Sequence, residues 1–180
     1  MKALLDACVL YPTVLREILL GVAREGLYTP LWSDRILEEW ARAAARFGPA
    51  AEAQARGEVA VVRAEFPKAS VPRHEGLEAR LHLPDKNDIH VLAAAIAGGA
   101  DAIITFNRAD FPRGTLSIEG LDRRDPDGFL WELWSDHPET VGRVVEAVRA
   151  KAERLSGEPQ PLRPLLKRAR LPRLGKALAG

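Results

Sequence analysis

The chain has one cysteine, Cys8, and no CxxC or HExxH motif among its 180 residues. A lone cysteine excludes an internal disulfide framework and is typical of a reducing compartment, so we expect a cytoplasmic protein. The apolar neighbours of Cys8 indicate a small buried side chain rather than a nucleophile. The histidines are few and scattered, which argues against a zinc site; they are His74, His82, His90 and His137.

Long apolar runs are also lacking. No stretch approaches the ~18 residues that a membrane-spanning helix needs, so we expect no membrane partner. The opening MKALLDACVLYP reaches Asp6 before any hydrophobic stretch develops, unlike a secretory signal. Hydrophobic residues nevertheless make up 47% of the chain, which is enough for a core. At this length we expect one compact domain with an appendage.

A net charge of only +1 hides an uneven distribution of charge. Residues 143–180 carry 10 Lys and Arg against 3 Glu, a net of +7, which leaves 16 against 22, a net of −6, in residues 1–142. An acidic body with a basic tail suits a polyanion or an acidic protein as partner. An ordinary solvated helix face would explain the same pattern.

Short apolar stretches alternate with amphipathic ones along the first two thirds of the chain. We expect strands at residues 2–9, 69–71, 102–105 and 115–118, and helices at residues 13–25, 33–47, 49–66 and 85–97. This alternation predicts a parallel sheet with helices on both faces. From Asp125 onward the pattern is helical, with a Pro-rich hinge at residues 157–164. We therefore predict one domain at residues 1–122 and a helical extension with a basic tail at residues 123–180.

Oxygen-bearing side chains occur where predicted strands end and where one helix begins. Asp6 follows the first apolar stretch, and Asn107 and Asp110 follow the strand at 102–105. Asp85 and Asp88 open the helix that precedes this strand in the chain. The carboxyl ends of parallel strands lie at one edge of a sheet, where ligands bind in open α/β folds. Hard oxygen ligands gathered there suit Mg²⁺ or Mn²⁺. The sequence therefore predicts metal-assisted phosphodiester chemistry.

Each of these residues also has an ordinary structural explanation. Asp85 and Asp88 are typical of an N-cap and a first helical turn, and Asp6, Asn107 and Asp110 are typical of Asx turns. A carboxylate that closes a buried strand is costly, however, unless it is paired or bound to a metal. The joint pattern, rather than any single residue, favours a functional site.

Two adjacent glutamates lie in the helix that Ser33 is expected to cap. Neighbouring residues on a helix point in different directions. Glu39 lies near the apolar side of the helix, three positions after Ile36, whereas Glu38 faces outward. A glutamate on a helix is more often a surface residue than a ligand, so Glu39 alone is a weak signal.

Four segments together resemble the motifs of PIN-domain nucleases, specifically the VapC-like toxins of bacterial toxin–antitoxin pairs. The segments are LLDACVLYP with Asp6, WSDRILEEW with Glu39, PDKNDIHVLAAAI with Asp88 and the accessory Asp85, and ITFNRADFP with Asn107 and Asp110. The strictest form of the fourth motif has Asp where this chain has Asn107, and in similar sequences the position of Asp110 can serve instead. The region around DPDGFLWELW resembles the C-terminal extension of a longer VapC-like subgroup.

The resemblance implies a PIN-like three-layer α/β/α sandwich with a central parallel sheet of four to five strands. It also implies an endoribonuclease that depends on Mg²⁺ or Mn²⁺ and leaves a 5′-phosphate and a 3′-hydroxyl. The partners implied are RNA, a small antitoxin protein that blocks the site, and a second copy of the chain in a homodimer.

The same resemblance assigns roles to individual residues. The expected catalytic residues are Asp6, Glu39, Asp88 and Asp110, and the expected metal ligands are Asp6, Asp88, Asn107 and Asp110. Secondary roles fall to Asp85, Ser33 and Thr105. We expect the substrate phosphates to be bound by Arg108 and Arg113, with the basic C-terminal segment as a further candidate.

Three other functions are open at this point. A catalytically weakened PIN-like fold could act as an RNA- or protein-binding scaffold, and Asn107 is the residue that supports this alternative. A second rival is a phosphotransfer domain of the receiver or haloacid-dehalogenase type. The dehalogenase type would need an Asp-x-Asp motif, which the sequence Asp6-Ala7-Cys8 does not provide. A receiver would need an acceptor Asp on a central strand and a later Lys, and we find neither. Cleavage of DNA rather than RNA depends on groove shape and 2′-hydroxyl contacts, which sequence does not reveal.

Overall fold

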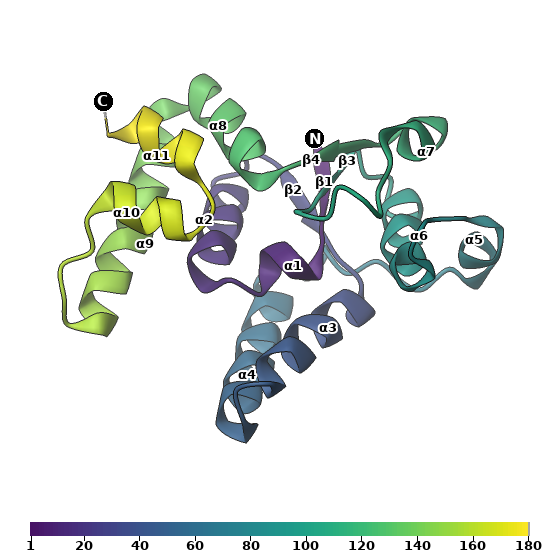
Figure 1. Cartoon of the computed structure of the whole chain (residues 1–180), viewed down its shortest axis with the longest axis horizontal. Helices are drawn as coiled ribbons and strands as arrows, with labels where there is room; N and C mark the ends of the chain where they lie inside the picture. Colours follow the sequence, from purple (N-terminus) through teal and green to yellow (C-terminus); the bar gives the residue numbers. More distant parts are fainter. Residues whose placement is uncertain (180) are drawn as a thin grey trace. The chain divides into compact units, whose positions relative to one another are not determined.

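The computed structural model describes residues 1–179 and divides the chain into two compact units (Figure 1). The first unit consists of Met1–Tyr11 and Thr29–Arg124. The second consists of Pro12–Tyr28 and the chain from Asp125 onward. The segment Pro12–Tyr28 thus groups with the C-terminal helices, and the domain boundary at residue 122 stays a prediction.

The first unit contains a parallel sheet of four strands. The strands are β1 (Lys2–Leu5), β2 (Thr29–Leu31), β3 (Ala102–Ile104) and β4 (Asp122–Arg124), in the spatial order β2-β1-β3-β4. Leu4 of β1 pairs with Leu31 on one side and Ile103 on the other. The central strands are buried, as expected of a parallel sheet covered by helices. This confirms the predicted α/β class and the parallel sheet.

Helices flank the sheet within the first unit, and aromatic side chains fill part of its core. The helices are α1 (Ala7–Leu10), α3 (Asp34–Ala45), α4 (Pro49–Glu65), α5 (Glu75–Arg80), the 3₁₀-helix η1 (Lys86–Asp88), α6 (Ile89–Ala97) and α7 (Arg113–Ile118). Helices α3 and α4 lie side by side (Figure 1). Trp32, Trp40 and Phe111 are almost wholly buried, which makes them major contributors to the core.

The order of the strands determines where a site can form. The chain leaves β1 to build β2 on one side, and later crosses to build β3 on the other side of β1. The sheet order therefore reverses between β1 and β3, and the carboxyl ends of these two strands open onto the crevice where α/β folds bind ligands. The backbone N–H of Asp6, which follows β1, donates to the carbonyl of Ile104 at 3.2 Å.

One predicted strand is shorter than expected, and another was wrong. The strand expected at residues 2–9 ends at Leu5, because the side chain of Asp6 accepts a hydrogen bond from the Ala7 N–H at 2.7 Å and begins α1. The strand expected at residues 115–118 is part of α7, and the fourth strand is β4 instead. Gly120 adopts a φ of 72° and lets the chain turn out of the helix into β4.

Two further elements are shorter than the sequence indicated. The segment 69–71 contributes a single bridge between Ser70 and Trp32 rather than a strand. The helix expected from residue 85 starts with the 3₁₀ turn η1, and Asp85 caps this turn by accepting from the Asn87 N–H at 2.8 Å. The regular helix α6 then begins at Ile89.

The second unit is helical. Its helices are α2 (Thr13–Arg24), α8 (Pro126–Asp136), α9 (Pro138–Ser156), α10 (Leu162–Arg168) and α11 (Pro172–Leu178). Helices α2 and α9 pack closely at Gly21, where a Cβ would lie 2.5 Å from a methyl carbon of Val144. The Arg173 guanidinium stacks 3.6 Å from the Trp131 ring centroid and joins α11 to α8. Within the described residues, no helix combines the length and apolar character needed to span a membrane.

Candidate metal centre

Asp6 lies at the carboxyl end of β1 and is held there by hydrogen bonds. One carboxylate oxygen accepts from the Ala7 N–H. The other accepts from the Thr105 hydroxyl at 2.7 Å and from the Cys8 thiol at 3.3 Å. Only 8% of Asp6 is exposed, so these donors compensate for the water that burial removes. The side chain is therefore oriented before any ligand arrives.

Three carboxylates converge beside this strand end. Oxygen atoms of Asp85, Asp88 and Asp110 all lie within 4.8 Å of one another. Asp85 and Asp88 come from η1, which leads into α6, and Asp110 comes from the loop after β3. Oxygen atoms at this spacing can share one hard divalent cation. Residues from two separate segments are thus brought together, and their roles in a site stay predictions.

Asn107 joins two of these carboxylates. Its amide nitrogen donates to Asp88 at 3.1 Å and to Asp110 at 2.7 Å, while its amide oxygen accepts from the Asp110 N–H at 3.3 Å. The backbone N–H of Asn107 donates to the Thr105 hydroxyl at 3.0 Å. In this arrangement Asn107 orients acidic neighbours, and metal ligation by its amide oxygen stays a prediction.

The pKa of Asp88 is affected by the charges of the acidic residues around it. Its pKa is raised from 3.8 to about 6, first by partial burial and then by the negative charges of Asp6, Asp85, Asp110 and Glu39. Among the described residues, no lysine or arginine forms an ion pair with Asp85, Asp88 or Asp110 to offset this charge. The cluster therefore carries uncompensated negative charge, which favours binding of a cation.

Comparison with protein-family models agrees with this geometry. The model described as PIN domain matches residues 2–109, which is more than half of the chain. The chain belongs to the PIN-domain family. No curated protein and no solved structure shows a significant match. The matched region contains β1, β3 and all of the clustered residues except Asp110, which lies one residue beyond it.

The two adjacent glutamates of this PIN domain have opposite surroundings. Glu38 pairs with Arg42 at 2.9 Å and Arg56 at 2.8 Å, and these hydrogen bonds lower its pKa to about 2. The negative charge of Glu39 contributes to the raised pKa of Asp88. Glu39 also lies 3.4 Å from Arg35 across one turn of α3. Of the two, only Glu39 is available to the candidate site.

Sequence reasoning missed two neighbours of the PIN-domain acids. The Nε2 atom of His90 lies 2.8 Å from a carboxylate oxygen of Glu39, although the histidine had been dismissed as scattered. Cys8 is partly exposed and donates to Asp6, and its pKa is raised to about 12 chiefly by burial. Both neighbours could have been suspected from the sequence, because His90 comes two residues after Asp88 and Cys8 comes two residues after Asp6.

The remaining predicted residues support or surround this edge. Ser33 caps α3 by accepting from the Ile36 N–H at 3.2 Å, which positions the helix that carries Glu39. Thr105 is buried and links Asp6 to Asn107. Arg108 and Arg113 are exposed in the loop after β3 and at the start of α7. Their roles in substrate binding stay predictions.

Proposed function

We propose that this PIN-domain protein is a metal-dependent endoribonuclease. The observation that carries the proposal is the group of three carboxylates, Asp85, Asp88 and Asp110, whose oxygens lie within 4.8 Å of one another. The raised pKa of Asp88 supports it, because the folded chain leaves this negative charge without a protein cation. A site of this kind suits Mg²⁺ or Mn²⁺, which prefer oxygen ligands.

In this proposal Asp88 and Asp110 hold the cation, with Asp85 and Asp6 completing the acidic surroundings. A bound divalent cation would supply positive charge for the phosphate and make water more acidic. Every donor in the set is a hard oxygen, and none is a thiolate or an imidazole, so the residues fit Mg²⁺ or Mn²⁺ better than a softer metal.

The chain's own residues keep the site in order for hydrolysis. Thr105 and Cys8 fix the orientation of Asp6, and Asn107 holds Asp88 and Asp110 relative to each other. Glu39 helps to hold a second cation or orients the attacking water. Preorganised groups of this kind lower the barrier because they need not reorient as charge develops.

RNA as substrate and a toxin role follow from the resemblance to VapC-like proteins. In this proposal the chain is the toxin of a toxin–antitoxin pair, a small antitoxin protein blocks its acidic edge, and two copies form a homodimer. Arg108 and Arg113 hold substrate phosphates, since both are exposed close to Asp110 in the chain. Phosphate contacts of this kind would make RNA binding sensitive to salt.

Cleavage assays test the nuclease part of the proposal. Purified protein is mixed with end-labelled single-stranded RNA or with DNA of the same sequence, in Mn²⁺, in Mg²⁺ or in excess EDTA. We expect RNA cleavage with either metal, 5′-phosphate products and no cleavage in EDTA. Equal cleavage in EDTA would disprove metal dependence, and exclusive cleavage of DNA would disprove the ribonuclease assignment.

Expression in a bacterium tests the toxin part separately. The protein is expressed with and without the small open reading frame that adjoins its gene. We expect growth arrest that the neighbour relieves, and the Asp88→Asn variant should not arrest growth. Indifference of growth to expression of an active nuclease would rule out the toxin role while leaving the nuclease activity in place.

A second candidate function is a binding scaffold with a weakened catalytic site. The observation in its favour is Asn107, which adds no negative charge and directs its amide nitrogen at Asp88 and Asp110. Titration with Mn²⁺ separates the two functions. A rise in melting temperature supports the nuclease, whereas RNA binding without any response to Mn²⁺ supports the scaffold.

A further inference from the structure

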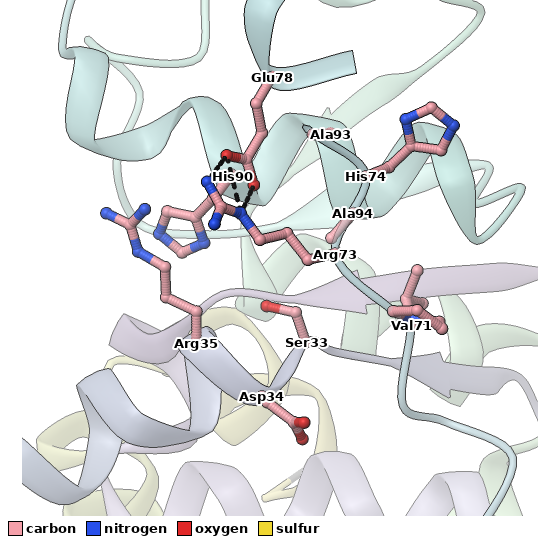
Figure 2. A pocket seen from close by; sticks show the side chains of 11 residues that line it. Ser33, Asp34, Arg35, Val71, Arg73, His74, Glu78, His90, Ala93 and Ala94 are labelled. Carbon is pink, nitrogen blue, oxygen red and sulfur yellow. Dashed lines mark hydrogen bonds and ion pairs between the residues drawn. The ribbon is translucent and has the colours of Figure 1, made fainter. Parts of the chain in front are cut away.

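A pocket of about 270 Å³ lies in the first unit, and one of the residues that line it, His90, lies 2.8 Å from Glu39. Its walls are largely apolar and include Val71, Ala93 and Ala94 (Figure 2). The volume is at the small end of the range for ligand pockets. It therefore suits one compact group rather than an extended ligand.

The charged groups around this pocket already have partners. The Arg73 guanidinium pairs with Glu78 at 2.8 Å, and Figure 2 shows this pair beside His90. Arg73 also pairs with Glu75 at 3.2 Å, and Arg35 pairs with Glu39 at 3.4 Å. An anionic ligand would have to compete with these carboxylates for Arg73 and Arg35, so the pocket offers it little electrostatic attraction. The charge pattern instead favours an uncharged occupant.

One polar group in the wall has no hydrogen-bond partner. His90 is 5% exposed and lines the pocket, and neither ring nitrogen has a hydrogen-bond partner among the described residues. Its Nε2 atom is 2.8 Å from Glu39, a distance typical of an ion pair, but the geometry is not that of a hydrogen bond. Buried polar groups without partners are rare and costly, so the imidazole can still be satisfied by a ligand.

We infer that this pocket holds one unpaired nucleobase of the RNA substrate, packed against Val71, Ala93 and Ala94 and hydrogen-bonded to His90. A nucleobase is uncharged, compact and flat, and its edge carries donors and acceptors. Proteins that recognise single-stranded RNA bind unstacked bases and form hydrogen bonds to their edges. The inference rests on the proposed nuclease function, because Glu39 contacts His90 and also acts on the acidic edge.

Binding of free nucleosides tests the pocket without any cleavage. Adenosine, guanosine, cytidine and uridine are titrated separately, in EDTA, into protein whose methyl and imidazole signals are observed by NMR. We expect at least one nucleoside to shift the signals of Val71, Ala93, Ala94 and His90 together. If no nucleoside shifts them at millimolar concentration, the inference is overturned.

A substrate series then tests whether the base enters the pocket during RNA binding. An abasic nucleotide is placed at each position of a short RNA in turn, and affinity is measured in EDTA by fluorescence anisotropy. We expect one position at which loss of the base weakens binding by about tenfold, which is the change that loss of about one hydrogen bond produces. The Val71→Phe variant, whose larger side chain fills the pocket, should bind intact and abasic RNA equally.

Controls keep the two hypotheses distinguishable. Val61→Phe makes the same change at a residue that is 64% exposed on α4, and it should behave like the parent protein. If Val71→Phe fails to fold, Ala94→Leu replaces it. Cleavage with Mn²⁺ together with indifference to every abasic position overturns the inference and leaves the nuclease function intact. Base-dependent binding without cleavage overturns the nuclease function and supports the pocket.

Discussion

The acidic edge of the sheet and the outer face of α3 and α4 hold the same kind of side chain in opposite electrostatic surroundings. On the outer face, Glu38 is flanked by Arg42 and Arg56, and its pKa falls to about 2. At the sheet edge, Asp88 is surrounded by other acids, and its pKa rises to about 6. The protein thus stabilises the charged form of Glu38 and destabilises the charged form of Asp88.

This difference separates structural acids from candidate functional ones. Carboxylates on the outer face belong to exposed ion pairs that contribute little to stability. The acids at the edge are partly buried and repel each other, so folding alone gives no reason to bring them together. A cation from solution would remove the repulsion. The first three predictions below compare the two regions, with Glu38→Gln as the control for a substitution at the acidic edge, and the last concerns the thiol beside Asp6.

The largest expected effect is on cleavage. Asp88→Asn should lower kcat/KM for RNA by about 10³-fold or more, because it removes charge that would hold the cation near the reacting phosphate. Asp6→Asn should act in the same direction. Glu38→Gln, which removes one charge from the same unit, should stay within about twofold of the parent protein. Rates are measured with labelled RNA in Mn²⁺, and circular dichroism verifies that each variant is folded.

Stabilisation by metal is the next largest effect. At a Mn²⁺ concentration of about 100 times the dissociation constant, binding to the folded state should add about 2.7 kcal/mol to the free energy of unfolding. For a chain of this size that corresponds to a rise in melting temperature of roughly 5 to 10 °C. Asp110→Asn should reduce the rise and Glu38→Gln should not. An equal rise in both variants would place the cation elsewhere.

A smaller effect concerns stability without metal. The pKa of Asp88 is higher in the folded state than the ordinary value of 3.8, so folding favours the protonated carboxyl group. The resulting contribution to the free energy of unfolding is fully present below about pH 4 and is lost as pH rises through 6. In EDTA, Asp88→Asn should therefore match the parent protein near pH 3.5. At pH 7.5 it should be more stable by roughly 1 to 2 kcal/mol, after allowance for solvent screening.

Urea unfolding at the two pH values measures this effect. Glu38→Gln provides the contrast, because the lowered pKa of Glu38 contributes stability above its ordinary pKa of 4.5 that is lost as pH falls toward 2. The two variants should thus change stability in opposite directions at pH 7.5. Destabilisation by Asp88→Asn at pH 7.5 would show that the acids at the edge do not repel one another.

The smallest expected effect concerns the thiol beside Asp6. Burial and the charge of Asp6 raise the pKa of Cys8 to about 12, so almost no thiolate is present at neutral pH. Cys8 in the folded protein should react with iodoacetamide far more slowly than in the urea-unfolded chain. Mass spectrometry measures the two rates. Comparable rates would mean that the thiol does not donate to Asp6 as the structure shows.

Much of the fold and of the acidic edge could be predicted from the sequence. Short apolar stretches such as Ala102–Ile104 indicate buried strands. The polar residues that follow them indicate strand ends, because burying a charged side chain without a partner is costly. Asp6, Asp88 and Asp110 could be placed at one edge on this basis. The strand at 115–118 was wrong because the β-branched residues Thr115 and Ile118 favour strands, and no side chain caps the short helix α7 that forms there.

The sequence by itself thus determined which residues end strands and begin helices, since those properties depend on near neighbours along the chain. Only the tertiary structure decided which side chains meet: Thr105 with Asp6, Asn107 with Asp88, and His90 with Glu39. The same holds for Pro12–Tyr28, which joins the C-terminal helices rather than the sheet. Burial, pKa and pocket shape depend on contacts between segments far apart in sequence, and these exist only once the chain has folded.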